Sequence, residues 1–142
     1  MKKVFIDTNI ILDVILERKN FVLESSNVLA LQVWNKIEIY ATSLTFINSL
    51  YICRKEIGKD ESINKLRTLF DRFQVSPLGQ DEYNAAMAMP MKDIEDNFQY
   101  CSAVSAGCDV LITRNIKDFP ADGKIKVMQP KEFLDSLVID EK

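Results

Sequence analysis

The chain has 142 residues, of which 47% are hydrophobic, and this length suits one compact domain with a substantial core rather than two. Its formal net charge of −3 provides no basic field for tight, sequence-independent binding of nucleic acid, and the absence of histidine excludes a Ser-His or Cys-His nucleophile pair. Because no apolar run is long enough to span a bilayer and the N-terminus lacks a signal-peptide pattern, we expect a cytoplasmic protein without membrane contact.

Short aliphatic segments alternate with amphipathic segments along the chain, which predicts an α/β fold with a mainly parallel sheet. The first expected strand covers residues 3–7, and Thr8 or Asn9 is suited to cap the helix that follows it. The next expected elements are, in chain order, a helix over 21–34, a strand over 37–41, a helix from Thr42 or Ser43 to near Gly58, a helix beginning at Asp60 or Ser62, a weak strand over 73–76, helices over 80–89 and 94–107, strands over 109–113 and 125–128, and a helix over 130–137. The chain contains no linker-like tract, so we expect residues 1–142 to form a single domain.

The three cysteines indicate a structural role rather than chemistry. Cys53, Cys101 and Cys108 are an odd number without C-x-x-C spacing, and without histidine a zinc site is not expected. Free cysteine behaves as a small hydrophobic residue. We therefore expect the three thiols to be reduced and buried.

The first predicted strand contains an apolar run over residues 4–6, yet it ends in the carboxylate of Asp7. Burying an unpaired carboxylate costs several kcal/mol, so another group should compensate for its charge. In open parallel sheets, functional sites gather at the carboxyl ends of the strands, where both Asp7 and Thr113 fall. Further polar candidates for the same edge begin the long predicted helix or follow the strand over 109–113: Asp93, Asp96, Asn115 and Asp118.

Several carboxylates held together without histidine favour a hard divalent cation, because Mg²⁺ and Mn²⁺ prefer oxygen ligands. Such a site activates a water molecule and stabilises charge at phosphorus, so phosphodiester hydrolysis is the natural reaction. Structural roles remain open for the same residues, since Asp93 and Asp96 suit helix capping and Asp118 suits a turn. The basic residues between positions 54 and 72 form either a solvated helix surface or a rim that guides a nucleic-acid strand.

Three segments of the chain are similar to the motifs of a known family. VFIDTNIILD, DIEDNFQYCSA and DVLITRNIKDF resemble the opening, central and closing motifs of the PIN-domain ribonucleases, which include the VapC-type toxins of toxin–antitoxin pairs. The resemblance spans nearly the whole chain and implies a Rossmann-like three-layer α/β/α sandwich with a central, mainly parallel sheet. It also implies endonucleolytic cleavage of RNA with Mg²⁺ or Mn²⁺, an antitoxin protein as partner, and a homodimer.

The resemblance further assigns roles to individual positions. The first acid of the family falls on Asp7 and its helix acid on Asp96, and these two are the implied metal ligands. Asn115 occupies a position that can be Asp or Asn in the family, and with Asp118 it completes the implied catalytic set. The implied substrate pocket consists of Thr8, Asn48, Asp93 and Thr113.

One position departs from the family pattern. The second family acid, usually a glutamate, aligns with Asn48, and no carboxylate occurs between Glu38 and Glu56. An amide oxygen can bind a metal ion but supplies no charge. Two hypotheses therefore remain open, a metal-dependent endoribonuclease and a catalytically weak or inactive PIN-like domain that binds RNA or a protein partner.

A phosphatase or phosphoryl-accepting domain is a third class that uses a strand-end aspartate. The phosphatase pattern expects a second aspartate two positions after the first, where this chain has Asn9. A receiver-like domain expects paired acids at the first strand end and a later strand-end lysine, and neither is evident. We therefore do not favour this class.

Overall fold

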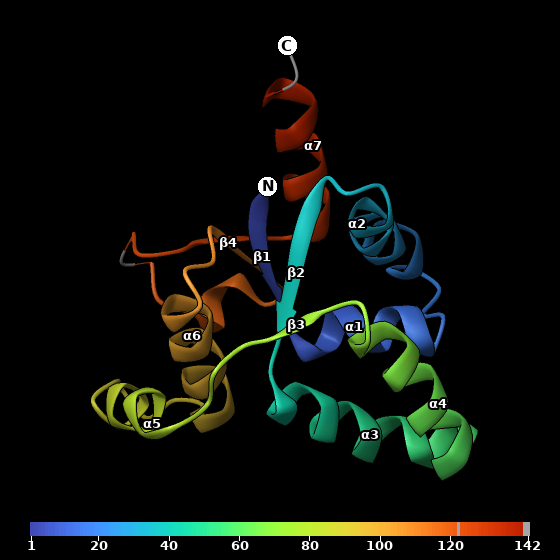
Figure 1. Ribbon diagram of the computed structural model, residues 1–142, viewed down its shortest axis with the longest axis horizontal. Helices are drawn as coiled ribbons and strands as arrows, with labels where there is room; N and C mark the ends of the chain where they lie inside the picture. Colours follow the sequence, from blue (N-terminus) through green and yellow to red (C-terminus); the bar gives the residue numbers. More distant parts are fainter. Residues whose placement is uncertain (122, 141–142) are drawn as a thin grey trace.

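The computed structural model describes residues 1–121 and 123–140, and its centre is a five-stranded sheet (Figure 1). The strands lie in the order β3-β2-β1-β4-β5, and every pairing is parallel. In register, Val4 of the central strand lies opposite Ile39 on one side and Val110 on the other. The strands are β1 (Lys2–Ile6), β2 (Ile37–Ala41), β3 (Gln74–Val75), β4 (Val110–Ile112) and β5 (Lys126–Met128).

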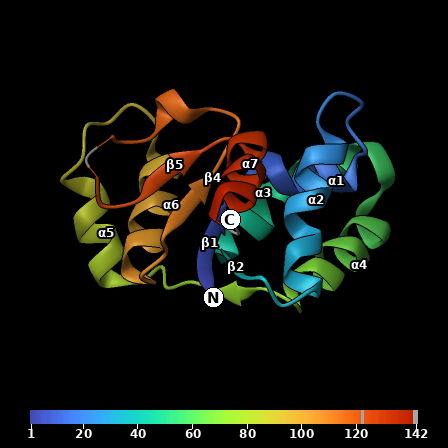
Figure 2. The same ribbon diagram turned by 90° about the horizontal axis from the view of Figure 1, so that it is seen from above.

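Helices cover both faces of the sheet, so the molecule has three layers. Seen from above, α5 and α6 lie on one side of the strands, and α1, α2, α3 and α4 lie on the other (Figure 2). The helices are α1 (Thr8–Ile15), α2 (Val22–Val33), α3 (Ser43–Ile57), α4 (Lys59–Phe70), α5 (Gln80–Met87), α6 (Ile94–Ser105) and α7 (Pro130–Asp140), with a 3-10 turn at Ile116–Asp118. The α/β/α fold expected from the sequence is confirmed. Within the described residues, no helix has both the length and the apolar character needed to cross a bilayer.

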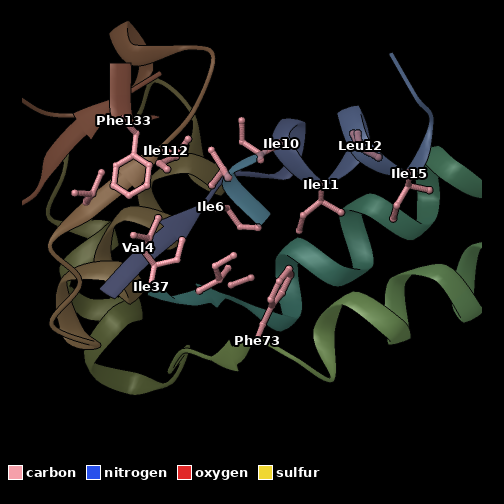
Figure 3. Packing of buried hydrophobic residues seen from close by; sticks show 14 of the residues in the cluster. Val4, Ile6, Ile10, Ile11, Leu12, Ile15, Ile37, Phe73, Ile112 and Phe133 are labelled. Atoms are coloured by element: carbon pink, nitrogen blue, oxygen red, sulfur yellow. The ribbon is translucent and has the colours of Figure 1, made fainter. Parts of the chain in front are cut away.

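Strand β1 belongs to two hydrophobic cores because its side chains alternate between the faces of the sheet. Val4 and Ile6 are fully buried on one face, where they pack with residues from α1, β2 and β4 (Figure 3). Phe5 is fully buried on the other face with Leu111 and Tyr100. A strand that is covered on both faces needs a continuous apolar run, which explains the residues that precede Asp7.

The N-cap of α1 differs from the sequence prediction. Asp7, rather than Thr8 or Asn9, occupies the capping position, with extended backbone angles of φ −77° and ψ 160°. Its side chain accepts a hydrogen bond from the backbone N–H of Thr8 at 2.7 Å. The prediction was wrong because Asp7 is the single residue between the end of β1 and the start of α1, so it must serve as the cap.

Other helix and strand boundaries also differ from the predictions. Helix α4 begins at Lys59 because Gly58, with φ +87°, turns the chain directly from α3 into α4. Strand β3 contains only Gln74–Val75, which pair with the end of β2. Helix α5 ends at Met87, two residues before the predicted end.

The three cysteines are free and buried, as predicted. Burial raises the pKa of the Cys108 thiol to about 12 and also raises the pKa values of Cys53 and Cys101. Because the reactive form of cysteine is the thiolate, these residues serve packing rather than catalysis.

Candidate active site

The candidate site lies at the carboxyl ends of β1 and β4, where the order of strands in the sheet reverses. Asp7 directly follows β1, and Thr113 directly follows β4. The backbone N–H of Asp7 donates to the Ile112 carbonyl at 3.0 Å, and the Thr113 hydroxyl donates to Asp7 Oδ2 at 2.9 Å. Parallel pairing of the two strands thus joins side chains that are 106 residues apart.

Asp7 is a buried carboxylate, with only 6% of its surface exposed. In addition to the bond from Thr113, its Oδ1 accepts the N–H of Thr8 at 2.7 Å, and its Oδ2 has a longer contact of 3.4 Å with Asn9 Nδ2. Burial raises the pKa of Asp7, and the hydrogen bonds from Thr113 and Thr8 oppose this rise without cancelling it. The carboxylate is therefore firmly held, and a nearby cation would stabilise its charged form.

Helices α1, α3 and α6 line an open cleft of about 460 Å³ beside Asp7. Thr8 contributes from α1, Asn48 from α3 and Asp96 from the first turn of α6. Burial and, to a lesser extent, neighbouring negative charges together raise the pKa of Asp96 to about 7, and these charges belong to Asp7, Asp93, Asp118 and Glu95. The cleft therefore brings together the two implied metal ligands, Asp7 and Asp96, which repel each other in the absence of a cation.

The oxygen atoms of the cleft fit a divalent cation. Thr8 Oγ1 and Asn9 Oδ1 are buried at the cleft without a hydrogen-bond partner, so a cation or its water molecules would satisfy them. Within residues 1–121 and 123–140, no three acidic or thiol side chains converge into a complete metal cage. Mg²⁺ suits this arrangement, because proteins often bind it through one or two carboxylates together with water and substrate phosphates.

Glu95 is a residue of the cleft that the sequence analysis did not identify. Its Oε2 accepts a hydrogen bond from Asn48 Nδ2 at 3.0 Å, and both residues line the cleft. A carboxylate on α6 therefore lies next to Asn48, the residue of α3 onto which the resemblance places the second family acid. The only sequence signal was its place beside Asp96, and neighbouring residues on a helix point in different directions.

The remaining predicted site residues do not line the cleft. Asp93 caps α6 by accepting the N–H of Asp96 at 3.1 Å, which is the structural role left open by the sequence. Asn115 lines a neighbouring pocket, and its backbone N–H donates to the Thr113 hydroxyl at 3.0 Å. Asp118 lies exposed in the 3-10 turn and lines a separate pocket, although its charge still acts on Asp96.

A buried ionic network next to the cleft was also absent from the sequence predictions. Asp13 of α1 is fully buried, and its two oxygens accept hydrogen bonds from Nε and Nη2 of Arg114 at 3.0 and 3.1 Å. Ser25 donates to the same carboxylate at 3.0 Å, and Arg18 Nη1 lies 3.6 Å from it. The guanidinium of Arg114 also lies 3.9 Å from the ring centroid of Phe21. Because Arg114 belongs to the loop after β4, this network fastens that loop to α1.

The variant Asp96→Asn is expected to stabilise the metal-free protein at neutral pH. The pKa of Asp96 is raised from 3.8 to about 7 in the folded protein, so the folded state binds this proton more tightly than the unfolded state does. The contribution of protonated Asp96 to the free energy of unfolding is fully present below about pH 4 and is lost as the pH rises to about 7. Because Asp96 is partly exposed and solvent screens its charge, we expect a gain of about 5 °C in melting temperature near pH 8 with EDTA.

Thermal unfolding followed by circular dichroism across this pH range measures the effect. The wild-type curve should contain a decline in stability that the variant lacks. Identical pH profiles for the two proteins would show that Asp96 titrates normally.

A comparison with protein families places the chain among known proteins. The family model described as PIN domain matches residues 3–117, so the chain belongs to the PIN domain family. Among curated proteins, it is similar to Ribonuclease VapC1 of Aquifex aeolicus (strain VF5), with 26% identity over 137 residues that cover 93% of each chain.

Solved structures share the fold at lower sequence identity. VapBC2 from Rickettsia felis, bound to a DNA fragment from its promoter, matches with a TM-score of 0.66 and 17% identity over 88% of this chain and 96% of that chain. VapBC-1 from nontypeable Haemophilus influenzae matches with a TM-score of 0.65 and 18% identity over 91% and 98%. A toxin–antitoxin complex from Klebsiella pneumoniae matches with a TM-score of 0.65 and 23% identity over 89% and 97%. These likenesses agree with the three-layer fold described above.

Proposed function

We propose that this protein is a metal-dependent endoribonuclease that hydrolyses RNA phosphodiesters and acts as the toxin of a toxin–antitoxin pair. The observation that carries this proposal is the cleft that joins Asp7 and Asp96 at the carboxyl ends of parallel strands. The similarity to a curated protein named Ribonuclease VapC1 supports RNA as the substrate.

In this function, Asp7 and Asp96 hold Mg²⁺ or Mn²⁺, and the cation when bound activates water and stabilises charge at phosphorus. Thr113 and Thr8 fix the orientation of Asp7 through hydrogen bonds of 2.9 and 2.7 Å. Asp7 also accepts a proton from the attacking water. Asn48 lines the cleft and orients water and substrate, and the same role is proposed for Asn115 and Asp118 from the pockets that they line. Asp93 supports the site as the cap of α6.

The proposed partners follow from the same comparison. The structural neighbours are described as VapBC or toxin–antitoxin complexes, which supports an antitoxin protein as the partner of this chain. A homodimer in the cytoplasm is the proposed setting. A short reading frame for the antitoxin next to the gene would support this assignment.

The cleavage of single-stranded RNA by the purified wild-type protein tests the function. We expect internal cleavage with Mn²⁺ and a loss of cleavage when EDTA removes the ion, because two carboxylates alone cannot stabilise charge at phosphorus. Readdition of Mn²⁺ should restore the activity. Cleavage that persists in EDTA, or no cleavage with either Mn²⁺ or Mg²⁺, would reject the proposal.

A second candidate function is a catalytically weak PIN-like domain that binds RNA or protein, and Asn48 is the observation that favours it. The variant Asn48→Glu discriminates between the two functions, with Asn48→Gln as a control that keeps the amide. Because Glu95 already supplies a carboxylate 3.0 Å from Asn48, we expect Asn48→Glu to change cleavage by less than about tenfold. A gain of about a hundredfold or more would indicate that the natural protein is only a weak catalyst.

A further inference from the structure

Helix α3 presents an exposed aromatic ring at the carboxylate cleft. Tyr51 lines the same cleft as Asp7 and Asp96, and 53% of its surface is exposed. It follows Asn48 by three residues, so the two side chains lie on the same face of α3. Tyr51 therefore has an accessible aromatic surface in the same cleft as the proposed metal ligands.

The ring of Tyr51 is paired with a positive charge. The guanidinium carbon of Arg54 lies 4.5 Å from the ring centroid, in a cation–π arrangement. The guanidinium covers one face of the ring, and about half of the residue stays exposed. Arg54 is one of the basic residues for which the sequence left open a solvated surface or a nucleic-acid rim. Its contact with Tyr51 places its charge next to a residue that lines the cleft.

A second arginine contributes to the cleft from another element. Arg18, which follows α1, lines the cleft, and its Nη1 lies 3.6 Å from the buried carboxylate of Asp13. Although the centre of the cleft is acidic, positive charges thus occur at its edge. Such a distribution suits a ligand whose phosphates extend away from the metal ligands.

We propose that Tyr51, backed by Arg54, forms a subsite for an unpaired nucleobase next to the scissile phosphate, and this proposal rests on the proposed ribonuclease function. The base stacks on the open surface of the ring, and Arg54 attracts the adjoining phosphate. A nucleotide supplies both the aromatic plane and the negative charge that this pair of side chains recognises.

The same geometry favours single-stranded RNA over duplex RNA. In a duplex, each base is stacked between its neighbours, so its flat face is not accessible to Tyr51. An unpaired nucleotide exposes this face and stacks without a requirement for base identity. The substrate class is therefore single-stranded RNA or a loop, with the selectivity arising from an unpaired base.

RNA binding by matched variants tests the subsite. The probe is a fluorescein-labelled single-stranded oligoribonucleotide, measured by fluorescence anisotropy with the full chain and Ca²⁺ in place of Mn²⁺. We expect Tyr51→Ala to raise Kd on the order of tenfold and Tyr51→Phe to keep wild-type affinity, because the aromatic face is retained. Tyr83→Ala is the matched control, since Tyr83 is 51% exposed but lies on α5 and does not line the cleft.

An abasic scan of the oligonucleotide identifies the stacked base. In the wild type, one abasic position should weaken binding about as much as Tyr51→Ala does, and combining the two changes should cause little further loss. Equal affinity of Tyr51→Ala and Tyr83→Ala, additive losses at every abasic position, or no RNA binding by the wild type would overturn the subsite. A surface that serves a protein partner instead would give the first of these results.

The cleavage assay separates failure of the subsite from failure of the nuclease. With Mn²⁺, Tyr51→Ala should raise KM on the order of tenfold and leave kcat within about twofold of wild type. Cleavage that depends on Mn²⁺ but has an unchanged KM in Tyr51→Ala overturns only the subsite. Tyr51-dependent binding without any cleavage by the wild type supports the subsite and rejects the nuclease.

Discussion

The variant Asp7→Asn is expected to cleave RNA at a rate lower than that of the wild type by about a hundredfold or more. The amide has nearly the same shape and keeps one oxygen, but it removes the buried charge that would hold the cation and accept a proton. The rates of RNA cleavage with saturating Mn²⁺ measure this effect. Because burial raises the pKa of Asp7, the variant should fold at least as well as the wild type when metal is absent.

Asp71→Asn is the matched control for this prediction. Asp71 is exposed at the C-cap of α4 and does not line the cleft, so the same substitution should leave the cleavage rate unchanged. Circular dichroism and melting temperature establish that both variants are folded. A cleavage rate for Asp7→Asn that equals the wild-type rate would contradict the role assigned to this carboxylate.

The variant Asp13→Asn is expected to lower the free energy of unfolding by about 3 kcal/mol. Asp13 is fully buried and accepts two hydrogen bonds from Arg114, whose side chain is only 25% exposed. Removing the negative charge of Asp13 leaves the partly buried guanidinium of Arg114 without an ionic partner. This lowers the free energy of unfolding more than the loss of an exposed ion pair does. Urea denaturation of the metal-free protein measures the change.

The exposed pair between Lys131 and Asp135 provides the control. These side chains are 69% and 68% exposed and lie 3.7 Å apart, so Asp135→Asn should change stability by less than about 0.5 kcal/mol. If Asp13→Asn and Asp135→Asn lowered the free energy of unfolding equally, the buried Asp13 network would contribute no more stability than an exposed ion pair. Intact folding of Asp13→Asn with weaker RNA cleavage would also reveal how the network positions the loop after β4.

The central part of the fold was predictable because local patterns specify it. The three residues before Asp7 are all apolar, as a strand covered on both faces requires, and the predicted parallel sheet is confirmed. Once the sheet was predicted to be parallel, the meeting of Asp7 and Thr113 at one edge followed from topology. The structure shows this meeting as a hydrogen bond of 2.9 Å.

Contacts between distant side chains were not predictable in the same way. The bond between Asn48 and Glu95 joins residues 47 apart, and the pairing of Asp13 with Arg114 joins residues 101 apart. Their partners depend on how helices and loops pack around the sheet, which periodicity does not encode. The catalytic roles of Asn115 and Asp118, which line other pockets, remain predictions.

Isothermal titration of the metal-free protein with Mn²⁺ tests the central claim most directly, which is that Asp7 and Asp96 together hold a divalent cation. The wild type should bind Mn²⁺ saturably, and Asp7→Asn and Asp96→Asn should each weaken this binding by about tenfold or more, whereas Asp71→Asn should not. Equal Mn²⁺ affinity in all four proteins, or no binding by the wild type, would contradict the claim.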